Sequence, residues 1–228
     1  PAYKIASFEN SHIPLIQKVG ATGKPVIIST GMATLAQISD TVQAIRDAGC
    51  EQFILLKCTS SYPADPSDSN ILTIPHLRTL FNCEVGISDH TMGIGCSLAA
   101  VSHGATIIEK HFTLSREEEG VDSSFSLEPN DMKLLVEESE RAWLSIGKVK
   151  YGPTALEKKS LIFRRSIYIA EDVKKGDLLD KKNLRIIRPG FGLDPKYYEG
   201  LINCRVNKDI KKGTPFSWDL VLNKDNAD

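Results

Sequence analysis

The stretch Val85-Gly86-Ile87-Ser88-Asp89-His90 decides the fold expected of this chain, because a short apolar run passes directly into polar residues that can carry chemistry. The same order recurs along the chain. The other runs are 3–6 before Ser7 and Glu9, 26–28 before Ser29 and Thr30, 53–56 before 59–62, and 106–108 before 109–111. Polar groups at the carboxyl ends of successive parallel strands are typical of the mouth of a TIM-type (β/α) barrel.

Segments with helical signals lie between these runs. Thr34 and Gln37 form a capping-box pattern at the start of one helix. Residues 94–103 predict a short buried helix, and a longer one is expected from about residue 130 up to residue 147. The alternation of strands and helices predicts a parallel sheet. A dinucleotide-binding fold is disfavoured, because no GxGxxG motif follows a strand.

The predicted barrel is incomplete. A complete barrel has eight units and about 250 residues, whereas only five strands fit before Gly147. The chain starts at Pro1 and enters a strand almost at once, which favours truncation upstream. We therefore expect an α/β fold: residues 1–147 as the last five units of a TIM barrel, 148–162 as a linker, and 163–228 as a small β-rich domain.

The second domain contains an internal echo. The sequence DVKKG at residues 172–176 recurs as DIKKG at residues 209–213. This repeat predicts two similar β-turn units, each preceded by an alternating apolar strand. The lysines are most simply interpreted as solvated turn residues, as short charge runs usually are.

Composition narrows the possible partners. The net charge is −1, with 28 basic and 29 acidic residues, which gives no electrostatic footprint for nucleic acid or a membrane surface. No apolar run approaches the roughly 20 residues needed to span a bilayer, and no signal-peptide pattern opens the chain. The five cysteines are an odd number and suit reduced thiols. A soluble, cytoplasmic protein is expected.

Two histidines end neighbouring predicted strands. His90 follows Ser88-Asp89, and His111 follows Glu109-Lys110. Adjacent barrel strands would bring the two imidazoles together, and two such ligands leave open positions for water and substrate, as in a catalytic metal site. The alternative is two hydrogen-bonded strand-end histidines without a metal.

Four serine hydroxyls and one lysine ammonium are expected around the same barrel mouth as the two histidines. They are Lys4, Ser7, Ser29, Ser60 and Ser88. Converging hydroxyls and an ammonium suit a phosphorylated or carboxylated ligand, although each serine alone is explained as well by a turn or cap. Glu9 and Glu109 could relay protons or activate water, or they could simply pair with lysines.

Taken together, these motifs resemble the sialic acid synthase family over nearly the whole chain. The stretches that carry the resemblance are KIAS 4–7, ISTGM 28–32, CTSSYP 58–63, SDHT 88–91, EKHF 109–112 and SLEP 126–129. The tail, with FRRS 163–166 and RPGFG 188–192, resembles the antifreeze-like (SAF) domain of those enzymes. In the family that domain crosses to the partner of a domain-swapped homodimer and presents an arginine to the substrate, a role implied here for Arg188.

The resemblance implies a reaction. Phosphoenolpyruvate condenses with an N-acetylated aminosugar aldehyde to give a nine-carbon nonulosonic acid, and His90 and His111 hold a divalent metal, Mn²⁺ or Mg²⁺. Other roles follow by matched position: phosphoenolpyruvate binding by Lys4, Ser7, Ser29, Ser60 and Ser88, catalysis by Glu9 and Glu109, and sugar binding by Tyr62, Asp122 and Arg188.

Residues 120–129 and 188–193 are most similar to pseudaminic acid synthases, which act on a 2,4-diacetamido-2,4,6-trideoxy hexose. Phe125 would suit a deoxygenated sugar, because an apolar contact tolerates a methyl group. Three alternatives stay open: an N-acetylneuraminate or legionaminate synthase using an N-acetylmannosamine-type sugar, a non-catalytic binding or assembly module, and an aldolase-like barrel with Lys110 as a Schiff base. The last is disfavoured, because Lys110 alternates with Glu109 and His111 and should point away from them. The truncated chain alone is expected to be inactive.

Overall fold

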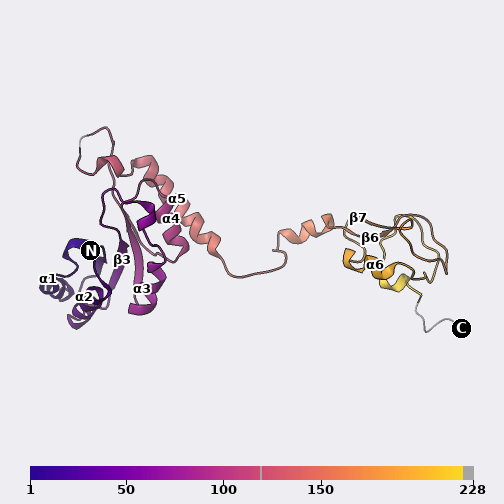
Figure 1. Cartoon of the computed structure of the whole chain (residues 1–228), viewed down its shortest axis with the longest axis horizontal. Helices are drawn as coiled ribbons and strands as arrows, with labels where there is room; N and C mark the ends of the chain where they lie inside the picture. The colour runs from indigo at the N-terminus through magenta and orange to yellow at the C-terminus, as the bar shows by residue number, and fades with distance from the viewer. Residues whose placement is uncertain (119, 223–228) are drawn as a thin grey trace. The chain divides into compact units, whose positions relative to one another are not determined.

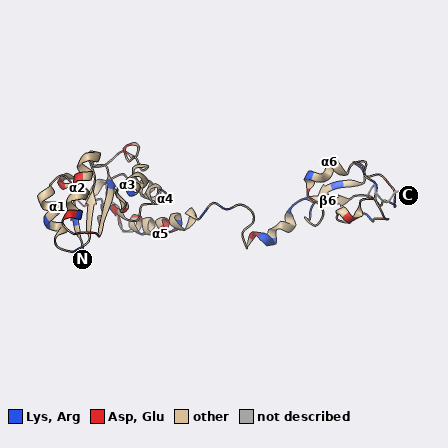
Figure 2. Ribbon diagram, turned by 90° about the horizontal axis from the view of Figure 1, so that it is seen from below, with Lys and Arg blue, Asp and Glu red and all other residues tan. Residues whose placement is uncertain are grey.

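The computed structural model describes residues 1–118 and 120–222, which form two compact units divided between Lys148 and Val149 (Figure 1). Each unit has its own apolar core. Charged side chains of both signs are interspersed over the two units (Figure 2). Among the described residues, none of the helices combines the length and the hydropathy needed to cross a bilayer.

The first unit is built on a five-stranded parallel sheet whose spatial order follows the chain. The strands are β1 (Tyr3–Ile5), β2 (Val26–Ser29), β3 (Phe53–Cys58), β4 (Glu84–Asp89) and β5 (Ile108–Lys110). Right-handed crossovers that always step in one direction place the connecting helices on one face of the sheet. The unit is therefore a half-barrel, and the predicted partial TIM barrel is confirmed.

Five helices connect or follow the strands of the sheet, and Figure 1 labels each of them. They are α1 (Ile13–Gly20), α2 (Leu35–Asp47), α3 (Thr73–Phe81), α4 (Gly95–Ser102) and α5 (Pro129–Ile146). Thr34 caps α2 as predicted: its hydroxyl accepts from the Gln37 N–H, while the Gln37 side chain accepts from the Thr34 N–H. The helices expected within 94–103 and from 130 to 147 are also confirmed.

The last strands run further than their apolar residues indicate. β3 continues to Cys58, β4 to Asp89 and β5 to Lys110. The strand expected at 106–108 is thus displaced, because its hydrogen-bonded ladder pairs Glu109 with Ser88 and Lys110 with Asp89. The apolar residues show only which part of a strand contacts the core, whereas the hydrogen bonds between strands continue into the polar residues that follow.

The second unit is β-rich and small. Strand β6 (Ser166–Ile169) pairs antiparallel with β7 (Leu184–Ile187), and one short helix, α6 (Tyr198–Leu201), follows. Phe216 is fully buried in its core. The backbone ahead of β6 is exposed and includes a 3-10 segment, Glu157–Phe163.

The two echoed turns of this unit cap each other. The Asp172 carboxylate accepts from the Lys212 N–H at 2.8 Å, and the Asp209 carboxylate accepts from the Lys175 N–H at 2.8 Å. Val173 and Ile210 join the turns by a pair of backbone hydrogen bonds. The first turn follows β6, as expected, whereas the second follows isolated bridges rather than a regular strand.

Asp172 should make the stability of this unit depend on pH. Its pKa lies below the ordinary value, because the Lys211 ammonium and the Lys212 N–H both donate to the carboxylate. A carboxyl group whose folded pKa is depressed stabilises the fold above its unfolded pKa of about 3.9, and that contribution is lost as the pH falls through the lower folded value. We expect Asp172→Asn to unfold more readily than the unaltered chain at pH 7, and the difference to shrink in acid.

The measurement is urea unfolding at a series of pH values, followed by amide hydrogen exchange at the two turns. Glu199→Gln is the control, since Glu199 is exposed and has no ion pair within the described ranges. An Asp172→Asn effect that is the same in acid as at neutral pH would contradict the prediction.

Candidate functional site

The carboxyl ends of the five strands carry a connected cluster of polar side chains. The Lys4 ammonium at β1 donates to Ser29 Oγ of β2 at 2.9 Å and lies 3.3 Å from Glu109 Oε1 of β5. Ser88 Oγ of β4 donates to the same carboxylate oxygen at 2.7 Å. Side chains of the first and last strands therefore meet at this end, and Oε2 of Glu109 has no partner among the described residues.

The loops after β1, β2 and β3 meet beside this cluster. Ser60 Oγ donates to Ser7 Oγ at 2.8 Å. Gly31 lies against both, with a positive φ of 49°, and a Cβ placed there would be 2.3 Å from Ser7 Cβ and 2.7 Å from Ser60 Oγ. Glycine is required at this turn for both its φ and its lack of a side chain.

The two histidines lie side by side at the ends of β4 and β5, with ring centroids 5.2 Å apart. His90 is 6% exposed, and its Nδ1 lies 2.9 Å from the Thr59 carbonyl. His111 Nδ1 lies 3.3 Å from Asp122 Oδ2. A carbonyl or carboxylate oxygen can only accept, so each Nδ1 carries a proton, and in the neutral ring each Nε2 then keeps a lone pair for a ligand.

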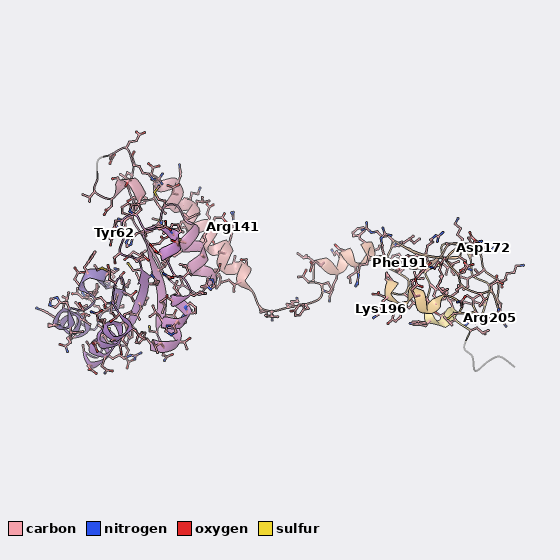
Figure 3. All side chains as sticks on the ribbon, in the orientation of Figure 1. Tyr62, Arg141, Asp172, Phe191, Lys196 and Arg205 are labelled. Carbon is pink, nitrogen blue, oxygen red and sulfur yellow. The ribbon has the colours of Figure 1, made fainter. Side chains whose placement is uncertain are left out.

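Aromatic rings pack around this pair. Tyr62, labelled in Figure 3, lies 4.3 Å from the His90 ring and 6.1 Å from Phe125. Phe125 lies 5.0 Å from the His111 ring and is only 4% exposed. Tyr62 is 42% exposed and presents one side to solvent. The apolar rings restrict how the imidazoles can turn.

The histidine environments differ. Burial lowers the pKa of His111, and any positive charge on nearby His90 lowers it further. Burial also opposes charging of His90, but hydrogen bonds to Cys58 and the Thr59 carbonyl outweigh it and raise the His90 pKa. Burial raises the pKa of Cys58, but its contact with His90 prevails and leaves the pKa below the ordinary value. His111 is therefore the imidazole held more firmly in the neutral, ligand-competent form.

The donor set fits a divalent transition ion. No cluster of three or more His, Cys, Asp or Glu side chains suited to a metal occurs in residues 1–118 and 120–222. Two imidazoles with free Nε2 atoms would therefore supply the protein ligands, and water or substrate oxygens would complete the shell. Because Mg²⁺ prefers oxygen ligands throughout, this pair suits Mn²⁺ better.

A buried ion pair lies directly behind the histidines. Lys110 Nζ is 3.1 Å from Asp89 Oδ2, and the two side chains are 2% and 1% exposed. Burial raises the pKa of Asp89, but hydrogen bonds from Ser97 and Thr91 and the Lys110 charge together hold it below its usual value. Lys110 points away from Glu109 and His111, as the strand alternation predicts.

Most of the predicted site residues come together in this one region. They are Lys4, Ser7, Ser29, Ser60, Tyr62, Ser88, His90, Glu109, His111 and Asp122. Two predicted residues are not part of these contacts: the Glu9 side chain is exposed and has no polar contact within the described ranges, and Arg188 is an exposed residue that belongs to the second unit.

Sequence reasoning missed two features of the site. Asn10 is buried, and its amide donates to the Ser29 carbonyl at 3.2 Å, which fixes the loop after β1 against β2. The second feature is the Asp89–Lys110 pair. The sequence did contain a signal for this pair, because residues of opposite charge, Asp89 and Lys110, directly precede the two predicted metal-binding histidines.

Comparisons with known proteins give consistent results. The model of the NeuB family matches residues 1–151, and that of the SAF domain matches residues 164–222. A pseudaminic acid synthase of Helicobacter pylori is 38% identical over 96% of this chain and 65% of its own length. An N,N'-diacetyllegionaminic acid synthase of Campylobacter jejuni is 35% identical over 92% of this chain and 64% of its own length.

Among solved structures, an N-acetylneuraminic acid synthetase of Leptospira borgpetersenii, crystallised with citrate, is similar at 38% identity. The match has a TM-score of 0.65 and covers 70% of this chain and 56% of that one. The chain spans 65% and 64% of the two curated relatives named above.

Gly31 provides a test of the site's packing. We expect Gly31→Ala to lower the free energy of unfolding by about 1–3 kcal/mol, the usual cost of overpacking, and to separate Ser7 from Ser60. Gly93→Ala is a matched control, because Gly93 also has a positive φ but open space where its Cβ would lie. Urea unfolding of both variants is the measurement, and equal losses would show that Gly31 is constrained only by its backbone conformation.

Proposed function

We propose a function for this chain from one premise: it belongs to the NeuB family. Its relatives include synthases of pseudaminic, legionaminic and N-acetylneuraminic acids, so the chain is related to enzymes that make nonulosonic acids. We propose that the protein condenses phosphoenolpyruvate with an N-acetylated aminosugar to make such an acid. The observation that carries this is the pairing of His90 and His111 at the same strand ends that bear the Lys4 and serine cluster.

Phosphoenolpyruvate is assigned to the polar cluster. Lys4 offers an ammonium that is one-third exposed, and Ser7, Ser29, Ser60 and Ser88 offer hydroxyls from four neighbouring chain segments. An anion with phosphate and carboxylate groups matches such a set of donors. In the structure Lys4 is held by Ser29 and Glu109. The bound anion would compete with Glu109 for this ammonium and leave the carboxylate freer to act.

A divalent ion, preferably Mn²⁺, is assigned to His90 and His111. When bound it would supply Lewis acidity toward the sugar aldehyde. The protein's own residues do the remaining work. Lys4 and the serines fix the orientation of phosphoenolpyruvate so that its carbon 3 can form the new carbon–carbon bond. In this proposal the former aldehyde oxygen takes up a proton as the carbon–carbon bond forms, Glu109 accepts a proton from the water that adds to carbon 2, and phosphate then leaves with cleavage of the C–O bond.

The sugar is assigned to the aromatic side of the site. Tyr62 offers an exposed face next to His90. Asp122 contacts His111, so it would orient that ring as well as meet the sugar. Phe125 is too buried to contact the sugar directly. In this proposal it affects sugar specificity by fixing the positions of Tyr62 and His111, against which it packs.

Two further roles rest on matched sequence positions alone. Glu9 is proposed to assist proton transfer, although its side chain is exposed and has no polar contact among the described residues. Arg188 is proposed to reach the sugar site of a partner subunit in a domain-swapped homodimer. Neither role is argued from the contacts seen in the first unit.

Pseudaminic acid is the product we propose, because synthases of that acid from two organisms are 38% identical to this chain. A legionaminic acid synthase at 35% identity makes the diacetylated legionaminic acid the second candidate. The first experiment is manganese-dependent phosphate release by the protein that carries this chain. The 2,4-diacetamido-2,4,6-trideoxy hexose, its legionaminic counterpart and N-acetylmannosamine are offered in parallel.

We expect turnover with the first sugar. Turnover only with another sugar would support the proposed reaction but change the proposed product. No phosphate release with any of the three sugars would favour a non-catalytic module. The isolated 228 residues, assayed alongside, are expected to release no phosphate.

Asp122 allows a test of the metal assignment. Removal of an outer-shell partner of a metal-binding histidine typically costs 10–100-fold in affinity. We expect Asp122→Asn to weaken Mn²⁺ binding by about tenfold or more, because a neutral amide orients and polarises the His111 ring less well than a carboxylate. Titration calorimetry is the measurement. Glu117→Gln, an exposed charge change on the same segment, is the control, and equal affinities for the two variants would contradict the assignment.

A further inference from the structure

A buried charge directly precedes each of the two paired histidines. Asp89 precedes His90 on β4, and Lys110 precedes His111 on β5. The two charged residues are direct partners in the strand register, with Nζ and Oδ2 3.1 Å apart. Both side chains are almost completely buried, at 1% and 2% exposure. Nothing in the reaction proposed above uses them.

The pair is fully engaged in hydrogen bonds. Asp89 Oδ1 accepts from the Thr91 N–H at 2.8 Å and the Thr91 hydroxyl at 2.7 Å, while Oδ2 accepts from Ser97 of α4 at 2.6 Å. Lys110 also donates to the Thr91 carbonyl at 2.6 Å. The network therefore holds the residue that follows His90 and ties it to both β5 and α4.

This network lies on the opposite face of the strands from the polar cluster. Ser88 and Glu109 are also register partners, one position earlier on each strand, and are joined at 2.7 Å. Side chains alternate between faces along a strand. The end of β4 is thus joined to the end of β5 on both faces, and the two histidines are the residues that follow.

A buried ion pair is a poor device for stability alone. Two apolar side chains of similar size often stabilise a fold as well or better, because charges lose their hydration on burial. Charged hydrogen bonds, however, are directional, and they fix separation and angle where apolar contacts permit sliding. Metal ligands need that precision, since a site that is loose by about 1 Å fails.

We propose that Asp89 and Lys110 are positioning residues that set the separation of His90 and His111 for a divalent cation. The cation itself rests on the proposed function, whereas the placement of the imidazoles does not. Asp89→Asn/Lys110→Met tests the pair, because asparagine can keep the contacts to Thr91 and Ser97 while both buried charges are removed. The matched control is Arg78→Met/Glu84→Gln, which removes a more exposed ion pair at 3.0 Å at the other end of β4.

Two readouts are made on the full chain. Titration with Mn²⁺ should show at least about a tenfold loss of affinity in the Asp89→Asn/Lys110→Met variant and none in the control. Side-chain ¹H–¹⁵N spectra without metal should show the His90 and His111 signals shifted or broadened, while those of His12, His76 and His103 stay unchanged. Lys110→Arg, which keeps the charge, should fold and shift the same two signals less.

A folded double variant with unchanged His90 and His111 spectra would overturn the proposal. If the double variant does not fold, Lys110→Arg decides by the same spectra: selective shifts support the proposal, and unchanged signals overturn it. Absence of Mn²⁺ binding by the unaltered chain would remove the proposed metal, and the histidine spectra would still decide the positioning role.

Discussion

The curvature of the five-stranded sheet is the constraint on which the site depends. Neighbouring strands are about 4.8 Å apart, so a flat sheet would separate β1 and β5 by roughly 19 Å. Instead, Lys4 of β1 lies 3.3 Å from Glu109 of β5. The two side chains are 34% and 40% exposed, and such partly exposed ion pairs contribute at most about 1 kcal/mol. The polar contact is thus a consequence of the curvature rather than its main cause, and the apolar residues that pack between sheet and helices stabilise the curved sheet.

The alternation of side chains divides the strand ends into two kinds of surface. Glu109 faces the mouth and remains partly accessible, as chemistry on a ligand requires, and it is joined there to the buried Ser88. Asp89 and Lys110 face the helix layer and are closed to solvent. The register of β4 against β5 determines both surfaces. A shift of that register by one residue would therefore move the reactive side chains to the helix layer and the buried pair to the mouth.

Local signals explain what could be predicted from the sequence. The cap of α2 depends only on Thr34 and Gln37, and the proximity of His90 and His111 follows from adjacent strands in an ordered parallel sheet. Contacts that depend on three-dimensional packing were not predictable. The position of Glu9 is an example, since it follows from a 3-10 turn that leaves the side chain exposed. The isolated bridges of the second unit are another, because they lack the periodicity of regular strands.

The reciprocal turns of the second unit have a consequence for how that unit could have arisen. Each copy of the repeated pentapeptide supplies the carboxylate that caps the other, so neither cap exists within one copy. A single copy would leave these exposed N–H groups to water or to an identical second chain. Duplication and fusion would convert an exchange between two chains into the intramolecular one seen here, and a half that is moved alone would lose the cap of its turn.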